Sequence, residues 1–580
     1  MKKLLIFILV LSAVALLIAC GKQNQPRDTD VQSDTEQKQG VESENGEKNP
    51  ETQPKEEEKT IFNVSEHGLV ANAPEKASEN TKKLESLLKK AKKNATVFFP
   101  AGDYYLESTS FGCINLHGAK NLTLEGNGAT VINVSYDPTI KQNSATAGMS
   151  VILLLAECEN VTVKNLAFDY AAYTQVCGRV VSVGDGKTAI KIDSRYTDGT
   201  SKRSLTGREY IMAVNALDEN GLVKGDYYAP DSGFSASLAG DVYTISGNFG
   251  SEGDTLVARF SLGNYASPTI FAMGAKNVKF KNFRSYSSPS ATFYATLDNE
   301  NFTFDGYHVA PPDNAEWLWG SNVDSIHIKG IRGTVTLKNS TFRGLGDDAL
   351  NVHSIAGKVT KISGDKVYLE YFYGGDLDGI WSRSGDEIEF YDKSFKLVAT
   401  ATARASNNGS VTLENISGTI PVGSFARNKT TSPDLVIENV TVDGGRARAF
   451  LIQSKTATLN NCKISNLGLA AIIVAPDTKE WGEMGPCESF SASGLEIENV
   501  CTMKTEACRG AVMITNSHSG SVKGDGILHG TVKIVGSTFT NTNAPALYAI
   551  LTRDLTFTGN TLTGNTQSPV YTGCENVEVE

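Results

Sequence analysis

Short segments in which apolar and polar residues alternate recur along most of the chain. In each, a run such as Val-Thr-Val-Lys ends at an Asn or Gly, and a second short apolar run follows. Alternation with a period of two predicts β-strands that bury Val, Ile, Leu and Phe on one face. The corresponding Asn residues of two successive segments, Asn439 and Asn461, are 22 positions apart (461 − 439). The segments begin at Asn160, Asn277, Asn301, Thr334, Asp434, Thr456, Gly494 and Asp554.

Self-similarity at this period predicts a solenoid, in which each repeat is one coil and successive coils stack. We expect an all-β chain that forms a right-handed parallel β-helix of the pectate-lyase-like class. Asn and Gly at the bends supply the left-handed backbone that the corners of such a coil require. A leucine-rich repeat has a similar period, but it needs a framework of Leu residues that this sequence does not have.

The ends of a solenoid expose strand edges and core, so they need caps. Residues 78–93 have the amphipathic pattern of a helix, which we expect to cap the first coils within residues 61–177. Two stretches then interrupt the repeat, residues 178–264 and 357–430, and each is too long for a loop without structure of its own. We interpret both as small antiparallel β-barrels or sandwiches inserted into the β-helix. The β-helix itself continues through residues 265–356 and 431–580.

The N-terminus resembles a bacterial lipoprotein signal. Two lysines precede an apolar run that ends in Leu17-Ile-Ala-Cys20, and this run is short for a membrane span. We expect residues 1–20 to be a signal peptide, with Cys20 carrying the lipid, and the polar residues 21–60 to be a disordered tether. An ordinary secretory signal that ends in Ala-Cys is the alternative. A lipid at Cys20 would place the protein on the outer face of a bacterial cell membrane.

The net charge of −11 argues against nucleic acid as a partner. Of the nine Cys residues, the eight that follow Cys20 are scattered without a CxxC or a His/Cys ligand spacing, which argues against a structural zinc site. We expect free thiols, with a disulfide between Cys501 and Cys508, or between Cys462 and a Cys of a neighbouring coil, as the alternative. We also expect neither a metal ion nor an organic cofactor.

Three aspartates carry the most specific chemical signal in the chain. Asp324 and the pair Asp347 and Asp348 are separated by 23 positions (347 − 324), about one coil. Adjacent coils stack roughly 4.8 Å apart, so this spacing brings the three carboxylates together on the surface. Clustered carboxylates repel one another unless they have a use, and acid/base hydrolysis of a glycosidic bond is such a use. An Asp pair at a solvated turn is the alternative, although Gly344 and Gly346 indicate a bend at which both side chains can project outward.

Several polar residues near these aspartates are candidates for holding a sugar. Asn351 and His353 share parity in one predicted strand and would face one groove, whereas a hydrogen-bonded structural histidine is the alternative. Arg446 and Arg448 also share parity, and they would donate hydrogen bonds to ligand hydroxyls or to a catalytic Asp, or else act as solubilising charges. Gln453 follows them in the same run.

Aromatic side chains can stack on the C–H face of a sugar when they are exposed, and they anchor loops when they are buried. We expect Trp481 to stack on substrate, with Trp317 and Trp319 as weaker candidates. Glu483 would accept a hydrogen bond from a galactose hydroxyl or cap its loop.

In their order along the chain, these motifs resemble glycoside hydrolase family 110. The resemblance covers residues 66–580, and members of the family are β-helix exo-α-1,3-galactosidases with inserted barrel domains. The chain has Ala449 where the family pattern Arg-Ala-Arg-Gly leads us to expect Gly, which affects the floor of the pocket. The motifs are Gly346-Asp-Asp-Ala-Leu-Asn-Val-His353 after Asp324, then Arg446-Ala-Arg448-Ala-Phe-Leu-Ile-Gln453, then Trp481-Gly-Glu483.

The resemblance implies an exo-acting, inverting hydrolase that removes terminal α-1,3-linked galactose. Its partners would be galactose-terminated oligosaccharides with linear α-1,3-digalactosyl or blood-group-B-type ends, and a homodimer is compatible with it. On the basis of this resemblance we assign Asp347 as the general acid, and Asp324 and Asp348 as the base that activates water. Asn351, His353, the two arginines, Gln453, Trp481 and Glu483 would bind the substrate.

Two other hypotheses stay open. Polygalacturonases share the fold and a trio of aspartates, but their Gly-His-Gly and Arg-Ile-Lys signatures are absent from this sequence, so recognition of a uronate carboxylate has little support. A surface glycan-binding β-helix without catalysis is the second hypothesis, because the fold alone does not specify an enzyme. Such a protein would need no complete aspartate trio.

Overall fold

The computed structural model describes residues 59–580 except 110, 142–146, 202, 204, 231, 261–266, 371–380, 408, 479–480, 506 and 518–523. The predicted signal peptide, Cys20 and the predicted tether up to residue 58 lie outside the described residues. Within the described residues, the helices are all too short or too polar to cross a membrane.

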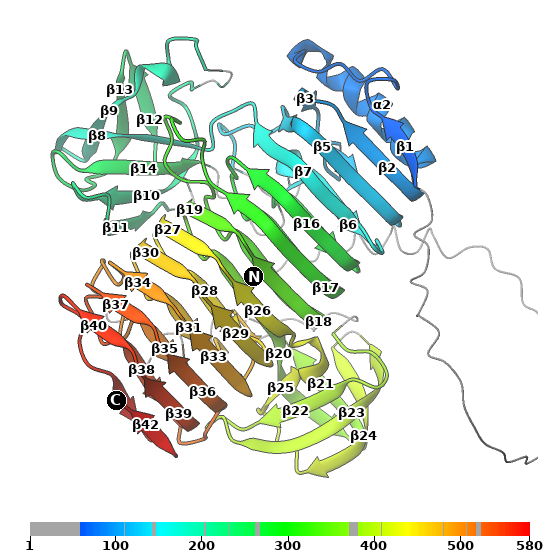
Figure 1. The fold of residues 1–580 in the computed structure, drawn as a ribbon, viewed down its shortest axis with the longest axis vertical. Helices are drawn as coiled ribbons and strands as arrows, with labels where there is room; N and C mark the ends of the chain where they lie inside the picture. Colours follow the sequence, from blue (N-terminus) through cyan, green and yellow to red (C-terminus); the bar gives the residue numbers. More distant parts are fainter. Residues whose placement is uncertain are drawn as a thin grey trace, which may run out of the picture. The chain divides into compact units, whose positions relative to one another are not determined.

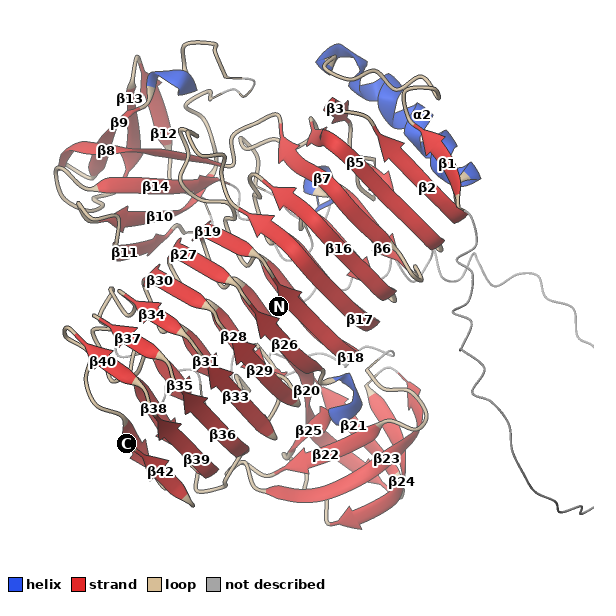
Figure 2. Cartoon of the chain, in the orientation of Figure 1, coloured by secondary structure: helices blue, strands red, loops and turns tan. Residues whose placement is uncertain are grey.

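Three stacks of parallel strands run through residues 60–580 as far as these are described (Figures 1 and 2). Corresponding strands of successive coils pair in register, so that Ile326 pairs with Leu350 and Leu350 pairs with Phe450. The prediction of an all-β parallel β-helix is confirmed. Several long strands bend at a corner and contribute to two stacks.

The first stack contains the strands that surround the candidate site. Its members are β4 (Ile114–Asn115), β6 (Leu153–Ala156), β15 (Ile270–Met273), β17 (Phe293–Val309), β18 (Ile326–Lys338), β20 (Leu350–Ser363), β28 (Phe450–Gln453), β31 (Ile472–Val474), β35 (Val512–Ile514), β38 (Leu547–Ile550) and β41 (Val570–Thr572).

The second stack also includes β17 and β18, and its other members are β1 (Thr60–Asn63), β2 (Lys93–Phe99), β5 (Lys120–Asn133), β7 (Thr162–Tyr170), β16 (Lys276–Ser285), β26 (Asp434–Glu438), β29 (Thr456–Asn460), β33 (Ser489–Ser493), β36 (His529–Val535), β39 (Thr552–Thr558) and β42 (Val577–Val579). The third stack shares β5, β7, β16 and β17 with the second, and adds β3 (Gly102–Leu106), β19 (Thr341–Leu345), β27 (Thr441–Gly445), β30 (Lys463–Leu467), β34 (Glu496–Glu498), β37 (Thr538–Thr540) and β40 (Thr561–Thr563).

The alternation seen in the sequence places apolar side chains inside the coils. Val335 and Leu337 of β18, for example, are fully buried, whereas the alternate residues Thr334 and Thr336 point away from the core. One continuous hydrophobic cluster runs from Val64 to Phe557 through the interior of the stacked coils. This burial is the main stabilising term, because each coil covers the apolar surface of the next.

Asparagines form ladders at the corners. Asn277 has a positive φ of 54°. Its amide donates to Asn160 Oδ1 over 3.0 Å and its Oδ1 accepts from Asn301 over 3.1 Å. Asn tolerates the left-handed backbone, and its side chain also satisfies the amide of the next coil. Both the left-handed backbone and the side-chain hydrogen bonds therefore favour Asn at the bends.

Helix α2 (Ala77–Lys90) lies beside β1, β2 and β3 at the end of the stacks where the described chain begins (Figure 1). Leu84, Leu87 and Leu88 are buried in the shared hydrophobic cluster. The sequence pattern predicts a helix over residues 78–93, but Lys93 is already the first residue of β2. Lys93 belongs to the strand because it pairs with Lys120 of β5.

A seven-stranded antiparallel sheet lies beside the stacks (Figure 1). It has a hydrophobic cluster of its own. Its strand order is β11-β10-β14-β8-β9-β13-β12. The strands are β8 (Gln175–Gly184), β9 (Lys187–Ile192), β10 (Ile211–Leu217), β11 (Val223–Tyr228), β12 (Ala236–Ala239), β13 (Val242–Ser246) and β14 (Thr255–Phe260).

A second antiparallel group grows directly out of β20. The first residues of β20 pair with β18 and β28, and its later residues pair with β21 and β25. The other strands of the group are β21 (Lys366–Glu370), β22 (Glu387–Tyr391), β23 (Leu397–Asn407), β24 (Ser410–Gly418) and β25 (Phe425–Asn428). Because one strand belongs to both parts, this group is fixed to the coil that carries the candidate site.

Candidate active site

The aspartates and arginines lie at one corner of three successive coils, just before strands of the first stack. Asp324 precedes β18, Asp347 and Asp348 precede β20, and Arg446 and Arg448 precede β28. The backbone joins these corners, because Ser325 N–H donates to Asp348 O over 2.8 Å. The structure thus brings the three aspartates together, with one oxygen of each within 4.8 Å of the others.

Both arginines are held by these carboxylates. Arg448 makes a bidentate contact with Asp348, with Nε to Oδ1 at 2.7 Å and Nη2 to Oδ2 at 2.9 Å. Arg446 Nη2 lies 2.8 Å from Asp347 Oδ2. Charge-assisted bidentate pairs fix orientation as well as supplying energy. The two arginines therefore orient the aspartates in this structure.

The three aspartates differ in exposure. Asp324 and Asp348 are 1% exposed, whereas the Asp347 side chain is 21% exposed. Oδ1 of Asp347 makes no hydrogen bond to any described residue, although Arg448 Nη2 lies 3.6 Å away. The Asp347 side chain is thus the most exposed of the three, although its Oδ1 is itself buried.

Burial changes the acidity of the two covered aspartates. Burial raises the pKa of Asp348 to about 7, against the lowering influence of Arg448, and the charge of Asp347 raises it further. Burial, followed by the charge of Asp347, holds the pKa of Asp324 well above its usual range. These groups titrate together, so a change at one shifts the other.

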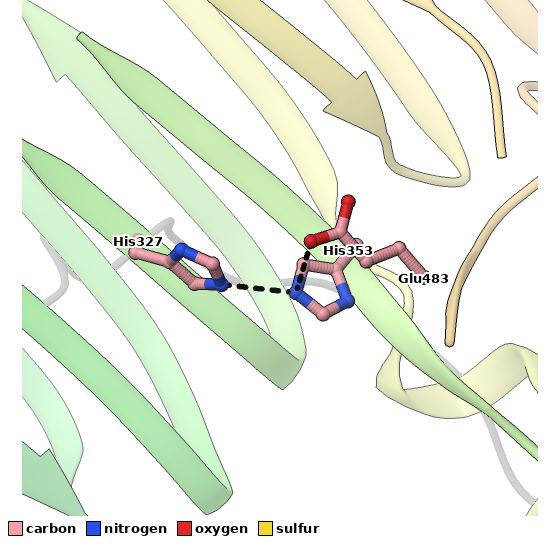
Figure 3. A group of neighbouring side chains, drawn as sticks. All are labelled: His327, His353 and Glu483. Carbon is pink, nitrogen blue, oxygen red and sulfur yellow. Dashed lines mark hydrogen bonds and ion pairs between the residues drawn. The ribbon is translucent and has the colours of Figure 1, made fainter. Parts of the chain in front are cut away.

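His327, His353 and Glu483 form a second polar cluster (Figure 3), and this cluster adjoins Asp324. His327 Nδ1 lies 2.7 Å from Asp324 Oδ2, and His327 Nε2 lies 3.1 Å from His353 Nε2. His353 Nε2 is in turn 3.6 Å from Glu483 Oε1. Burial lowers the pKa of both histidines to about 4, so each imidazole is neutral near neutral pH. His327 was not among the predicted site residues, although its position one coil before Asn351 could have identified it.

The remaining predicted polar residues gather around Glu483. Gln453 Nε2 donates to Glu483 Oε2 over 2.9 Å, and Asn351 Nδ2 donates to Oε1 over 3.4 Å. Strand β32 (Glu483–Met484) pairs antiparallel with β20, which places Ile355 opposite Glu483. Asn351, His353, Gln453 and Glu483 therefore form one buried network.

The tryptophans separate into exposed and buried ones. Trp481 is 56% exposed, two residues before Glu483. Trp317 and Trp319 are buried in the hydrophobic cluster of the seven-stranded sheet, where Arg203 lies over the Trp317 ring at 3.9 Å. Both therefore anchor the sheet against the coils in this structure, and neither presents a free face to a sugar.

The seven-stranded sheet also supplies charged residues that sequence reasoning missed. Asp226 of β11 accepts from Arg446 Nη1 over 3.2 Å. Arg259 of β14, almost fully buried, donates to the backbone oxygens of Asn322 and Gly346 over 2.7 and 3.2 Å. A Cβ at Gly346 would collide with Asn322 O, so the bend before Asp347 requires glycine at this position. No local sequence period connects these residues, because they lie in a different sheet.

Among the described residues, two groups of side chains have donor sets that could hold a metal ion. The aspartate trio is one, but Arg446 and Arg448 already supply positive charge there. The group of His327, His353 and Glu483 is the other. Chemically, the aspartates offer one partly exposed carboxylate and two buried ones with a raised pKa, which is a set suited to acid/base chemistry.

Comparison with known proteins gives relatives for most of the chain. No family model matches. The chain is 22% identical over 554 residues to α-1,3-galactosidase B of Bacteroides thetaiotaomicron, covering 88% of this chain and 87% of the relative. It is 23% identical over 510 residues to α-1,3-galactosidase A of Bacteroides fragilis, covering 81% and 80%.

Among solved structures, the chain is similar to the family 28 exopolygalacturonase of Yersinia enterocolitica, with a TM-score of 0.35 at 12% identity over 90% of this chain and 79% of that chain. The catalytic domain of a GH87 α-1,3-glucanase gives a TM-score of 0.37 at 8% identity over 91% and 70%. The relatives named α-1,3-galactosidase confirm the resemblance to glycoside hydrolase family 110 that the three motifs indicate.

Proposed function

We propose that this protein is an exo-acting glycoside hydrolase that removes terminal α-1,3-linked galactose. The observation that carries the proposal is the corner where Asp324, Asp347 and Asp348 meet two arginines, in a chain whose relatives are named α-1,3-galactosidases. Hydrolysis of a glycosidic bond needs a proton for the leaving oxygen and a carboxylate to activate water. Carboxylates at this corner can supply both.

In this proposal Asp347 protonates the glycosidic oxygen. Its side chain is the most exposed of the three, and Arg446 Nη2 lies 2.8 Å from its Oδ2. Asp324 and Asp348 activate the water. Arg448 holds Asp348 through both of its oxygens, so it keeps this carboxylate in a fixed orientation.

Inversion of the anomeric centre is a part of the proposal that rests on the family resemblance. Carboxyl groups of inverting enzymes stand roughly 6.5–9.5 Å apart, and those of retaining enzymes roughly 5–5.5 Å apart. One oxygen of each carboxylate lies within 4.8 Å of the others, but this is a distance between nearest atoms and is compatible with either range between the groups. Proton NMR of the first product decides: β-galactose from an α-linked end means inversion, and α-galactose means retention.

Trp481 is the candidate stacking surface for the sugar, because it is exposed beside the network that contains Glu483. Linear α-1,3-digalactosyl ends and fucose-branched blood-group-B-type ends are the two proposed substrates. Asn351, His353, Gln453 and Glu483 already bond to one another, so a galactose hydroxyl would exchange for one of these contacts. The rates of galactose release from oligosaccharides with these two ends show which one is the better substrate.

A polygalacturonase-like hydrolase is the competing proposal. Its substrate carries a carboxylate, which needs a cation, but Arg446 and Arg448 are both occupied by aspartates in this structure. Release of galactose from α-1,3-digalactose, lost in Asp347→Asn, supports the galactosidase. Shortened polygalacturonate without galactose supports the competing proposal, and absence of any product supports a glycan-binding protein.

For the remainder of the chain we propose that α2 caps the β-helix, and that residues 178–264 and 357–430 are inserted domains. The lipid at Cys20 and the position on the outer face of a cell membrane stay predictions, as does a homodimer. Labelling with a palmitate analogue tests the lipid directly, because Cys20→Ala removes the only acceptor proposed here.

A further inference from the structure

Three ligand-type atoms converge in the second polar cluster (Figure 3). His327 Nε2 and His353 Nε2 are 3.1 Å apart, and Glu483 Oε1 is 3.6 Å from His353 Nε2. Around a tetrahedral Zn²⁺ with bonds of roughly 2.0–2.1 Å, neighbouring ligand atoms stand roughly 3.3 Å from one another. Two of the three edges therefore match such a site, and the donor atoms of all three side chains lie within 4.8 Å of one another.

The three side chains come from separate segments and are all buried, with 1–5% exposure. His327 lies on β18, His353 on β20, and Glu483 on β32, which pairs with β20. Neighbouring coils in the first stack fix the two histidines relative to each other, because Lys329 of β18 pairs with His353 of β20. The donor atoms are thus held in place by strands, which is the arrangement that favours a preformed site.

The outer atom of each donor has a partner that points the inner atom toward the centre. His327 Nδ1 contacts Asp324 Oδ2 at 2.7 Å, and His353 Nδ1 contacts Ser354 O at 3.0 Å. Glu483 Oε2 accepts from Gln453 Nε2 at 2.9 Å. Carboxylate, backbone carbonyl and amide partners of this kind orient metal-binding histidines and carboxylates.

Hydrogen-bond directions add an independent reason. A carbonyl oxygen can only accept, so His353 carries its proton on Nδ1 and its Nε2 offers a lone pair. If His327 likewise donates from Nδ1 to the Asp324 carboxylate, its Nε2 also offers a lone pair. Two lone pairs and a carboxylate oxygen, which also accepts from Asn351 Nδ2 over 3.4 Å, then face one another, and a cation at their centre would be favourable.

We propose that His327, His353 and Glu483 bind a divalent transition metal ion of the Zn²⁺ class, with a fourth position open to water or ligand. Two imidazoles and one carboxylate suit Zn²⁺ and neighbouring first-row ions better than Mg²⁺ or Ca²⁺. The ion would tie β18, β20 and β32 together. With metal on Nε2, His327 keeps its proton on Nδ1 and donates it to Asp324, which links the site to the aspartate trio.

The opposing interpretation is a proton in place of the metal. If Asp324 is protonated and donates to His327, then His327 Nε2–H can donate to His353, and no cation is needed. Lys329, a buried cation two residues after His327, favours this alternative because it repels a metal ion. The two interpretations differ in metal content and in the response of stability to metal.

The experiment measures metal content and thermal stability of the full chain. Purified protein is incubated with one equivalent of Zn²⁺, dialysed, and analysed by elemental mass spectrometry, with Co²⁺ as a spectroscopic substitute. We expect about one ion per chain, visible d–d absorption with Co²⁺, and a higher Tm that a chelator reverses. His353→Gln and Glu483→Gln should lose the bound ion.

His529→Gln is the matched control. His529 is equally buried, but backbone groups of Cys487 and Thr515 occupy both of its nitrogens. This variant should keep the ion. Asp324→Asn should bind Zn²⁺ roughly 10–100-fold more weakly, because it removes the partner of His327.

The metal content and Tm of the wild-type protein test the proposal even if a variant fails to fold. Metal far below one ion per chain, together with an unchanged Tm in excess Zn²⁺, overturns the proposal in favour of the shared proton. Equal metal retention by folded His353→Gln and wild type also overturns it, because the ion would then lie elsewhere.

Discussion

Asp347 differs from Asp324 and Asp348 in both exposure and partners. The two covered aspartates are fixed by the backbone and by Arg448, with Asp348 N–H donating to Asp324 Oδ1 over 3.0 Å. Asp347 keeps one oxygen without a hydrogen-bond partner among the described residues. In a proposed acid/base trio, this asymmetry separates the group that meets the substrate from the groups that are held in place.

We expect Asp347→Asn to lower kcat for α-1,3-digalactose by roughly 10²–10⁴-fold, because an amide cannot transfer the proton to the leaving oxygen. The fold should be unchanged, since Asn keeps the shape of the side chain. Asp313→Asn is the control, because Asp313 is a 97% exposed aspartate on the segment before Asp324. Steady-state galactose release measures both. Near-normal turnover in both Asp347→Asn and Asp348→Asn would remove the trio from the mechanism.

The pH profile of kcat/KM should report Asp348. Burial raises the pKa of this carboxyl to about 7, and a base works only when it is ionised. Activity should therefore rise as the pH rises through about 7 and fall away at lower pH. Measuring kcat/KM between about pH 5 and 9 tests the direction. A decrease above pH 7 instead would mean that Asp348 supplies the proton and that the assigned roles are reversed.

The strands depend on their corners as much as on their apolar faces. Asn277 occupies a left-handed backbone position and sits between two other asparagines, to one of which it donates while it accepts from the other. A β-sheet strand alone does not define where a coil turns. The ladder defines it, because both the backbone conformation and the amide bonds require Asn at the same place in successive coils.

Substituting Asn277 should separate these two contributions. Asn277→Gly keeps the left-handed backbone but loses two side-chain hydrogen bonds, which contribute roughly 0.5–1.5 kcal/mol each. Asn277→Ala loses the bonds and also adds the left-handed penalty of roughly 1–2 kcal/mol. Denaturant midpoints should therefore fall in the order wild type, Gly variant, Ala variant. An Ala variant as stable as the Gly variant would show that the backbone conformation is not under strain there.

The sequence is informative where a feature repeats locally. The period from Asn439 to Asn461 predicts the coils, and the spacing between Asp324 and Asp347 predicts that their carboxylates meet. The sequence does not predict contacts between residues of different sheets. Nothing near Asp226 in the sequence indicates that this residue faces Arg446. Burial is equally hard to predict, since Trp317 packs inside the seven-stranded sheet's cluster while Trp481 is exposed.

The candidate site is assembled across parts of the molecule that are distant in sequence, and the seven-stranded sheet forms one side of it. Asp226 and Asp347 both contact the guanidinium of Arg446, at 3.2 and 2.8 Å. Thr502 Oγ1 also donates to the backbone of β11 at Val223 over 2.7 Å, so the sheet is fastened to the coils near this contact. The position of Arg446, and through it that of Asp347, therefore depends on the sheet.

Asp226→Asn tests this dependence without touching any residue that we place in the reaction. Loss of one carboxylate leaves Arg446 paired with Asp347 alone, which should draw the proposed acid away from its working position. We expect kcat to fall roughly tenfold to a hundredfold with little change in KM, since small misplacements of a reacting group have effects of this size. Asp241→Asn in the same sheet is the control, because its side chain is 49% exposed and pairs only with Lys191 among the salt bridges of the described residues. If both variants turn over like the wild type, the sheet is a neighbour of the site and does not position it; if only Asp226→Asn slows, a charge from a separate sheet is part of what holds the catalytic aspartate.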